Sequence, residues 1–190
     1  GHFNERIGGK MLNRVIHEAK GEVTLPRLLI VHGLFGSARN WSAIARNLAQ
    51  GREVVTVDQR NHGSSPWFPT QSYEDMGADI AAEIEDLGGP VDLLGHSMGG
   101  KAAMQVALTR PDLVRRLVVA DIAPVAYAHD QSGYIAKMRG LDLTDLTSRG
   151  EADRRLALVE PDPALRAFFL QSLDLKASPP RWRLNHDVLE

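Results

Sequence analysis

Short apolar runs alternate with longer segments of helical periodicity along the first two thirds of the chain. Four of these runs have the length and β-branched composition of buried strands, namely 28–33, 53–58, 91–96 and 114–124. This alternation predicts an α/β fold: a doubly wound, mostly parallel sheet, covered by helices on both faces and joined by right-handed crossovers. The earlier segment 13–23 predicts one or two antiparallel edge strands.

Helix signals fill the intervals between these strands. The first interval, 38–51, is predicted to pack through four apolar residues at helical spacing: Trp41, Ile44, Ala45 and Leu48. Ser72 is suited to cap the second helix, which should run to about Leu87, before two glycines and a proline. A third helix is predicted over 98–111. These helices are the crossovers that parallel strands require.

The pattern changes after Pro124. Residues 133–176 show helical periodicity and no clear strand, and one predicted helix face consists of Leu165, Phe168, Phe169 and Leu173. We therefore expect a core over 11–127 and a helical cap over 128–190. The cap would be inserted after the strand that ends near Asp121.

Composition narrows the class of protein. The 190 residues suffice for one domain with a substantial core, and 43% hydrophobic with 24% charged residues is an ordinary balance. A formal net charge of −2 gives no basic field to attract nucleic acid. The chain has no cysteine and no run long enough to span a membrane, and we expect a cytoplasmic protein of open oligomeric state. Residues 1–10 are interpreted as a tag remnant before a natural start at Met11.

One serine stands between two glycines where an apolar run meets an alanine-rich run. Gly95, Ser97 and Gly99 match G-x-S-x-G, the pattern that holds a nucleophile on a sharp strand-to-helix turn. The glycines are needed because side chains at those positions would collide with neighbouring elements. Ser97 would then lie at a helix start, where free N–H groups favour negative charge on a substrate oxygen. The alternative is a tight turn that carries an incidental serine.

A second glycine-rich turn, 32–37, follows the first parallel strand. Sites in open α/β sheets form at the carboxyl ends of the strands, so this turn should face the same place as Ser97. We expect the backbone N–H groups of Leu34 and Met98 to form an oxyanion hole, with Phe35 as the alternative to Leu34. For the His32 side chain, a local hydrogen bond is the favoured interpretation.

Four segments together resemble the α/β-hydrolase superfamily, and among its members the small bacterial YbfF-type esterases. They are "VHGLFGS", "VDQRNHGSS", "LLGHSMGGK" and "VVADIAPV", in the order and spacing of that superfamily. The resemblance implies a Ser–His–Asp hydrolase that acts on carboxylic esters or thioesters without a cofactor. It also implies two further strands and a final helix beyond the cap, so the chain is interpreted as truncated.

The resemblance places the acid and then the base after the nucleophile in the chain. None of the seven histidines stands where the family has its base, so the catalytic histidine is not identified. Asp121 ends a strand 24 residues after Ser97, and two interpretations of it stay open. It is either the acid that orients the histidine or a strand-end aspartate that caps a turn, with a later acid completing the triad.

Other residues near the strand ends are candidates for the pocket and its support. We expect His32, Phe35, His96 and Tyr127 to contact substrate. Asp58 and Arg60 are expected to fix their loop by pairing with each other. For His62 a structural turn role is favoured, with a place in the pocket wall as the alternative. No cluster of histidines and carboxylates has the spacing of a metal site.

Three functional hypotheses follow. The first is a serine hydrolase of esters with small to medium acyl groups, working through an acyl-Ser97 intermediate on a small-molecule substrate. The second keeps the scaffold for acyl transfer, perhydrolysis or hydrolysis of a carbon–carbon bond. The third, if the chain truly ends at Glu190, is a hydrolase-like binding module without turnover.

Overall fold

Five strands form one sheet in the order β1-β3-β2-β4-β5 in the computed structural model, which describes residues 11–120 and 131–190. In chain order, β1 to β5 are Arg14–His17, Leu28–Val31, Val54–Val57, Val91–His96 and Val114–Ala120. Only β1 runs antiparallel to its neighbour, β3; the other adjacent pairs in this sheet are parallel. The predicted α/β fold with a mostly parallel sheet is confirmed, and segment 13–23 supplies one antiparallel edge strand.

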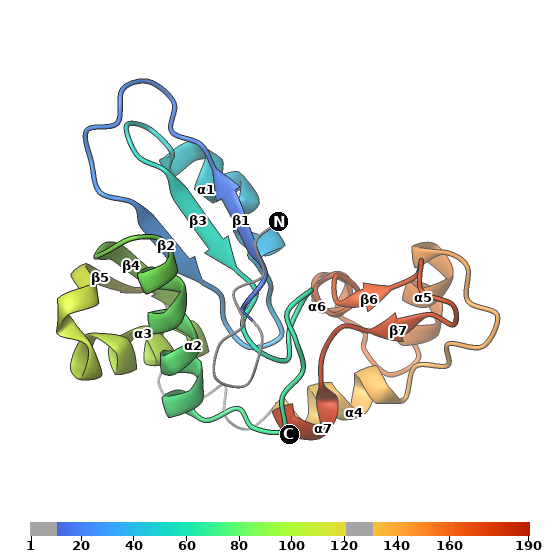
Figure 1. Cartoon of the computed structure of the whole chain (residues 1–190). Helices are drawn as coiled ribbons and strands as arrows, with labels where there is room; N and C mark the ends of the chain where they lie inside the picture. Colours follow the sequence, from blue (N-terminus) through green and yellow to red (C-terminus); the bar gives the residue numbers. More distant parts are fainter. Residues whose placement is uncertain (1–10, 121–130) are drawn as a thin grey trace. The chain divides into compact units, whose positions relative to one another are not determined.

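Helices cover both faces of this sheet (Figure 1). They are η1 (Ala38–Trp41), α1 (Ser42–Leu48), α2 (Tyr73–Asp86), α3 (Met98–Thr109) and η2 (Pro111–Leu113). Successive side chains on a strand point to opposite faces. Leu29 therefore packs in the core beneath α2 and α3, whereas Leu28 and Ile30 pack beneath α1. The predicted cap of α2 is present, since the Ser72 hydroxyl accepts a hydrogen bond from the Asp75 N–H at 3.1 Å.

The helix predicted over 38–51 packs differently from expectation. Its first turn is the 3-10 helix η1, and α1 follows. Ile44 and Leu48, which were predicted to face the core, are exposed, while Ala45 and Ala49 are buried against the sheet. The small alanines let the α1 backbone approach the strands closely, and this turns the longer side chains outward.

The second compact unit, Ala123–Glu190, has its own small core. Its helices are α4 (Gln131–Arg139), α5 (Arg149–Leu156), α6 (Pro163–Leu170) and α7 (His186–Leu189). Ile135, Leu156 and Phe169 are fully buried here. The expectation of no strand was wrong, because β6 (Leu173–Asp174) pairs antiparallel with β7 (Arg181–Trp182). The predicted boundary between 127 and 128 lies outside the described residues.

Asp58, at the end of β3, is bound by donors from three separate segments. Its carboxylate accepts hydrogen bonds from the Ala38 N–H at 2.8 Å, the Ser64 N–H at 3.0 Å and the Asn13 amide at 2.9 Å. The expected pairing of Asp58 with Arg60 is therefore wrong, because backbone and amide donors already occupy this carboxylate. Asp58 instead joins the start of the chain, the turn before η1 and its own loop.

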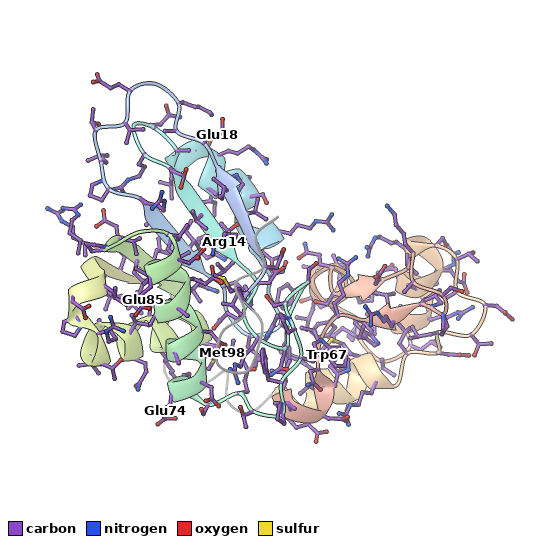
Figure 2. All side chains as sticks on the ribbon, viewed as in Figure 1. Arg14, Glu18, Trp67, Glu74, Glu85 and Met98 are labelled. Atoms are coloured by element: carbon purple, nitrogen blue, oxygen red, sulfur yellow. The ribbon has the colours of Figure 1, made fainter. Side chains whose placement is uncertain are left out.

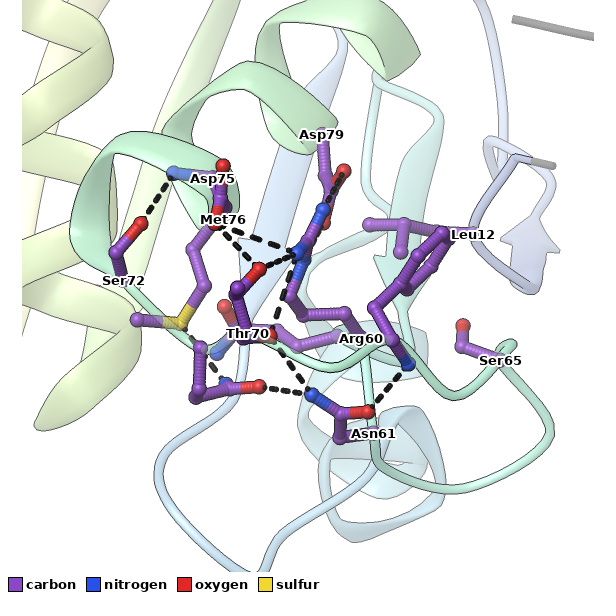
Figure 3. A network of polar contacts seen from close by, with 12 residues as sticks. Leu12, Arg60, Asn61, Ser65, Thr70, Ser72, Asp75, Met76 and Asp79 are labelled. Carbon is purple, nitrogen blue, oxygen red and sulfur yellow. Dashed lines mark hydrogen bonds and ion pairs between the residues drawn. The ribbon is translucent and has the colours of Figure 1, made fainter. Parts of the chain in front are cut away.

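Arg60 reaches α2 instead. Its guanidinium donates hydrogen bonds to both carboxylate oxygens of Asp79, at 2.7 and 3.0 Å, and to the Thr70 hydroxyl at 2.9 Å (Figure 3). The amide of Asn61 donates to the side chain of Gln71 at 2.7 Å in the same network. A bidentate arginine–carboxylate pair is among the strongest polar contacts in proteins. The loop after β3 is therefore fixed to the second helix.

Two buried histidines join the loops that follow β2 and β3. His32 Nδ1 lies 2.7 Å from the Gly33 carbonyl oxygen, and its Nε2 accepts from the Gln59 N–H at 2.9 Å. His62 repeats the arrangement: Nδ1 lies 2.8 Å from the Arg60 carbonyl oxygen, and Nε2 accepts from the Phe35 N–H at 3.1 Å. An N–H group can only donate, so each ring is neutral with its proton on Nδ1. Burial lowers the pKa of both rings, that of His62 to about 3.

Replacing Asp79 with asparagine should destabilise the protein by about 2 kcal/mol, since Arg60 would keep a nearly buried charge without its carboxylate. Urea unfolding of the two proteins measures this difference. Asp112→Asn is the matched control, because it removes an ion pair with Arg110 in which both side chains are exposed. That control should unfold like the wild type, and an Asp79→Asn protein of wild-type stability would contradict the role given to Arg60.

Stability should fall as the pH drops from about 6.5 toward about 3. In this window the unfolded His62 side chain binds a proton that the folded ring does not, so its contribution to stability is complete above about pH 6.5 and is lost below it. His62 should contribute a slope of about 1.4 kcal/mol per pH unit, and the lowered pKa of His32 acts in the same direction. Urea unfolding at about pH 7.5 and about pH 5 tests this. A His62→Gln protein should show a shallower slope, and equal wild-type stability at both pH values would refute the assignment.

Candidate active site

Ser97 is the single residue between the end of β4 and the start of α3. Its backbone has φ 55° and ψ −118°, a conformation that residues with a side chain rarely adopt. The Ser97 N–H donates to the Ala120 carbonyl oxygen at 3.1 Å, which ties the turn to the end of β5. The side chain is half-buried. The G-x-S-x-G segment therefore forms the strand–turn–helix geometry of a nucleophile elbow.

The two glycines of this turn are required by their neighbours. A Cβ added at Gly95 would come within 3.0 Å of the Gly99 carbonyl oxygen, and one at Gly99 would come equally close to the Val31 and His32 carbonyl oxygens. Real Cβ atoms essentially never approach that closely. The collision predicted from the sequence is thus present. An added side chain at either glycine would meet backbone atoms at the end of β2 or in the first turn of α3.

Met98 opens α3 directly after the serine (Figure 2). Its N–H belongs to the first helical turn, where no intrahelical acceptor exists. It donates to no other residue within 11–120 or 131–190. The positive end of the helix dipole lies at the same place. This amide is available to an anionic oxygen beside Ser97.

The loop after β2 leaves one N–H available in 34–38. Phe35 donates to His62, Gly36 to the Gly33 carbonyl oxygen, Ser37 to Asn40 and Ala38 to Asp58. The Leu34 N–H has no acceptor in the part of the chain that the structure describes. Since the Phe35 amide is occupied, the geometry favours Leu34 over its alternative as the donor from this loop.

Gly33 brings this loop against the serine. A Cβ added at Gly33 would lie 3.2 Å from the Ser97 Cβ and 3.0 Å from His96 Nδ1. The parallel pairing of β2 with β4 causes this contact, because their carboxyl ends lie side by side in the sheet. The loop that carries the Leu34 amide therefore lies beside the turn that carries Ser97 and Met98.

The remaining predicted pocket residues divide into three groups. His32 and Phe35 are almost fully buried, and both His32 ring nitrogens have backbone partners; contact of these two residues with substrate stays a prediction. His96 is half-buried with its ring 5.6 Å from that of Trp41, and its contact with substrate stays a prediction. Asp121 and Tyr127 lie outside the described residues.

No base is hydrogen-bonded to the serine within its own unit of the structure. Among residues 11–120, no histidine ring is hydrogen-bonded to Ser97 Oγ. The same residues hold no group of three histidine or carboxylate side chains placed to bind a metal ion. None of the described helices combines the length and apolar character needed to cross a membrane.

Sequence reasoning missed two supporting residues. Asp79 partners Arg60 although 19 positions separate them in the chain, and no local signal marks the pair. His62 was expected to support a turn or to line the pocket, whereas its ring holds the Phe35 amide. A histidine at a strand end beside several glycine and serine residues is a weak signal for such a contact.

Comparisons with known proteins agree with this geometry. The mouse protein named sn-1-specific diacylglycerol lipase ABHD11 is 42% identical over 178 residues, which are 89% of this chain and 58% of that protein. Esterase YbfF of Escherichia coli is 33% identical over 168 residues, 85% of this chain and 63% of that protein. The chain thus spans about three fifths of the length of these two relatives.

A solved structure described as a marine microorganism esterase is also similar. It has a TM-score of 0.82 and 33% sequence identity, and the match covers 93% of this chain and 69% of that one. A family model for the alpha/beta hydrolase fold matches residues 26–185. With the parallel sheet and the serine elbow, this match assigns the chain: it belongs to the α/β-hydrolase family.

Proposed function

We propose that the protein is a serine hydrolase of carboxylic esters or thioesters and that Ser97 is its nucleophile. One observation carries the proposal: Ser97 stands on a strained turn, and the N–H groups of Met98, the next residue, and of Leu34, in the neighbouring loop, have no acceptor among the described residues. Such a pair is suited to the oxyanion of a tetrahedral intermediate. The names of the mouse, E. coli and marine relatives support ester hydrolysis in particular.

The chemistry proceeds in two halves. Ser97 Oγ attacks the ester carbonyl carbon while a general base takes its proton, and the carbonyl oxygen becomes an oxyanion beside Leu34 and Met98. Collapse of this intermediate breaks the ester bond, the general base returns its proton to the leaving oxygen, and a neutral alcohol departs while the acyl group stays on Ser97. Water then repeats the attack and releases the acid. Each N–H donor is expected to lower the barrier by about 3–4 kcal/mol.

The backbone at Ser97 supports a functional role. A non-glycine residue in a sparsely populated conformation costs about 1–3 kcal/mol, and such strain concentrates at active sites. Glycine at position 97 would relieve this strain and stabilise the turn. A strained serine is therefore explained by a functional need for its hydroxyl, which glycine lacks.

The proposal requires an acid and a base besides the nucleophile. No histidine among residues 11–120 is hydrogen-bonded to Ser97 Oγ, and we propose that the base comes from another part of the protein. Asp121 follows β5 in the sequence, and β5 pairs in parallel with β4, the strand that leads into the elbow; we propose Asp121 as the acid that orients the base. Another acid outside the described residues is the alternative.

The proposed substrates are small-molecule esters with small to medium acyl groups. The name of the mouse relative adds a monoacylglycerol or diacylglycerol ester as a class to test. No nucleic acid is proposed as a partner, given a formal net charge of −2. No step of the proposed mechanism needs a cofactor.

Ser97→Ala should abolish covalent labelling of the full-length protein by a fluorophosphonate and lower kcat on 4-nitrophenyl esters by at least about 10⁴-fold. The hydroxyl forms the bond to phosphorus or acyl carbon, and alanine has none. Intact-mass spectrometry measures the labelling and absorbance measures the release of nitrophenol.

The control is Ser64→Ala, which removes an exposed hydroxyl from the loop after β3 and should leave both readouts unchanged. A folded wild-type protein that is neither labelled nor active would overturn the proposal. It would favour the hydrolase-like binding module instead.

Ser97→Gly should be more stable than Ser97→Ala by about 1 kcal/mol, because relief of the strain exceeds the entropic cost of glycine. The matched pair is Ser42→Gly and Ser42→Ala, at the start of α1, where φ is −58° and ψ is −44°. There the order should reverse, since this helical conformation is unstrained. Urea unfolding of the four proteins measures both differences, and the same order at both positions would argue against strain at Ser97.

A further inference from the structure

His62 lies outside the proposed triad and yet touches the loop that carries the Leu34 amide. Its ring is completely buried, which removes it from substrate. Its two nitrogens bind backbone groups of different segments: Nδ1 the Arg60 carbonyl oxygen at 2.8 Å and Nε2 the Phe35 N–H at 3.1 Å. The ring is therefore a bridge between the loop after β3 and the loop after β2.

The His62 bridge determines which backbone N–H of the loop after β2 is left without an acceptor. Phe35 has φ 64°, a left-handed conformation that is unusual for a bulky residue and needs support from its surroundings. The bond to His62 supplies that support and directs the Phe35 N–H toward the ring. The neighbouring Leu34 N–H is left without an acceptor in the described part of the chain.

The loop that carries His62 is rigid enough to act as an anchor. Arg60 is fixed to Asp79 by a two-point contact, and the Asn61 side chain donates to both Thr70 and Gln71 (Figure 3). Both neighbours of His62, Asn61 and Gly63, have positive φ, so the chain turns sharply on each side of the ring. The ring position is thus set by α2 and by the segment before it.

From these contacts we propose that His62 is a positioning residue: it holds the Phe35 amide so that the Leu34 amide faces the oxyanion that forms at Ser97. The inference rests on the proposed function. In this role the buried His62 imidazole orients a hydrogen-bond donor of another residue, the Leu34 N–H. Small displacements of a catalytic donor reduce rates strongly, so loss of the bridge should lower kcat more than substrate affinity.

Two substitutions separate this role from packing. A glutamine side chain can place an amide oxygen near the position of Nε2, where it can accept from Phe35, whereas asparagine reaches only the position of Nδ1. His62→Asn should lower kcat on a 4-nitrophenyl ester by about 30- to 100-fold with KM within about twofold. His62→Gln should keep kcat within about fivefold of wild type.

A trifluoromethyl ketone inhibitor, which forms an oxyanion on the serine, supplies a second readout. Its affinity should fall in parallel with kcat in His62→Asn and be restored in His62→Gln. Active sites are counted with a fluorophosphonate, so an unfolded fraction does not enter the rates. His17→Phe, a change of another histidine on the edge strand β1, is the control and should alter none of these values.

Backbone hydrogen exchange in the full-length protein tests the bridge without any turnover. A peptide that spans Phe35 should exchange faster in His62→Asn than in wild type or His62→Gln. Unchanged exchange and kcat in His62→Asn would overturn the positioning role while leaving the hydrolase proposal intact. Equal losses of kcat in the asparagine and glutamine proteins would overturn it too. An unlabelled, inactive wild type would instead remove the proposed function, and with it this role.

Discussion

The close approach of β2, β4 and α3 at one point of the sheet governs the rest of the candidate site. Added side-chain atoms at Gly95 or Gly99 would collide with backbone oxygens of the turn and of β2. The chain can pass from strand to helix here only with a glycine on each side of Ser97. Close packing of the backbone, together with the hydrogen bond from the Ser97 N–H to the Ala120 carbonyl oxygen, therefore fixes the turn on which Ser97 stands.

The sequence predicted those features of the fold that repeat along the chain. The parallel strands appeared as apolar runs because both faces of such a sheet are buried, and Ser72 marked the start of α2 through its capping hydroxyl. The contact face of α1 was predicted incorrectly, since Ile44 and Leu48 are exposed although their spacing is helical. Periodicity identifies the apolar residues of a helix, but the closeness of the sheet decides which of them are buried.

The sequence predicted those parts of the candidate site whose conformation depends on neighbouring residues in the chain. It did not predict the contacts between residues that lie far apart in the chain. The serine turn depends on a short motif and has the strand–turn–helix form inferred from it, whereas the oxyanion role of the glycine-rich loop stays a prediction. Arg60 was assigned to Asp58, which is close in sequence, whereas it binds Asp79 on α2. Choice of an ion-pair partner is a tertiary property, because it depends on which element packs beside the loop. The same holds for His62, whose contact with Phe35 spans 27 positions.

Two different kinds of interaction thus position the two proposed oxyanion donors: steric contacts for one and hydrogen bonds for the other. The Met98 amide is oriented by the helix that it begins, and steric crowding at Gly95 and Gly99 fixes that helix to the sheet. The Leu34 amide belongs to a loop without regular structure, whose neighbouring amides are satisfied one by one by side chains and by a turn. Steric contacts are insensitive to pH and to single polar substitutions, whereas each of those side-chain bonds depends on one acceptor. The Leu34 loop is therefore the part of the site where a residue remote from substrate, such as His62, can govern the geometry of catalysis.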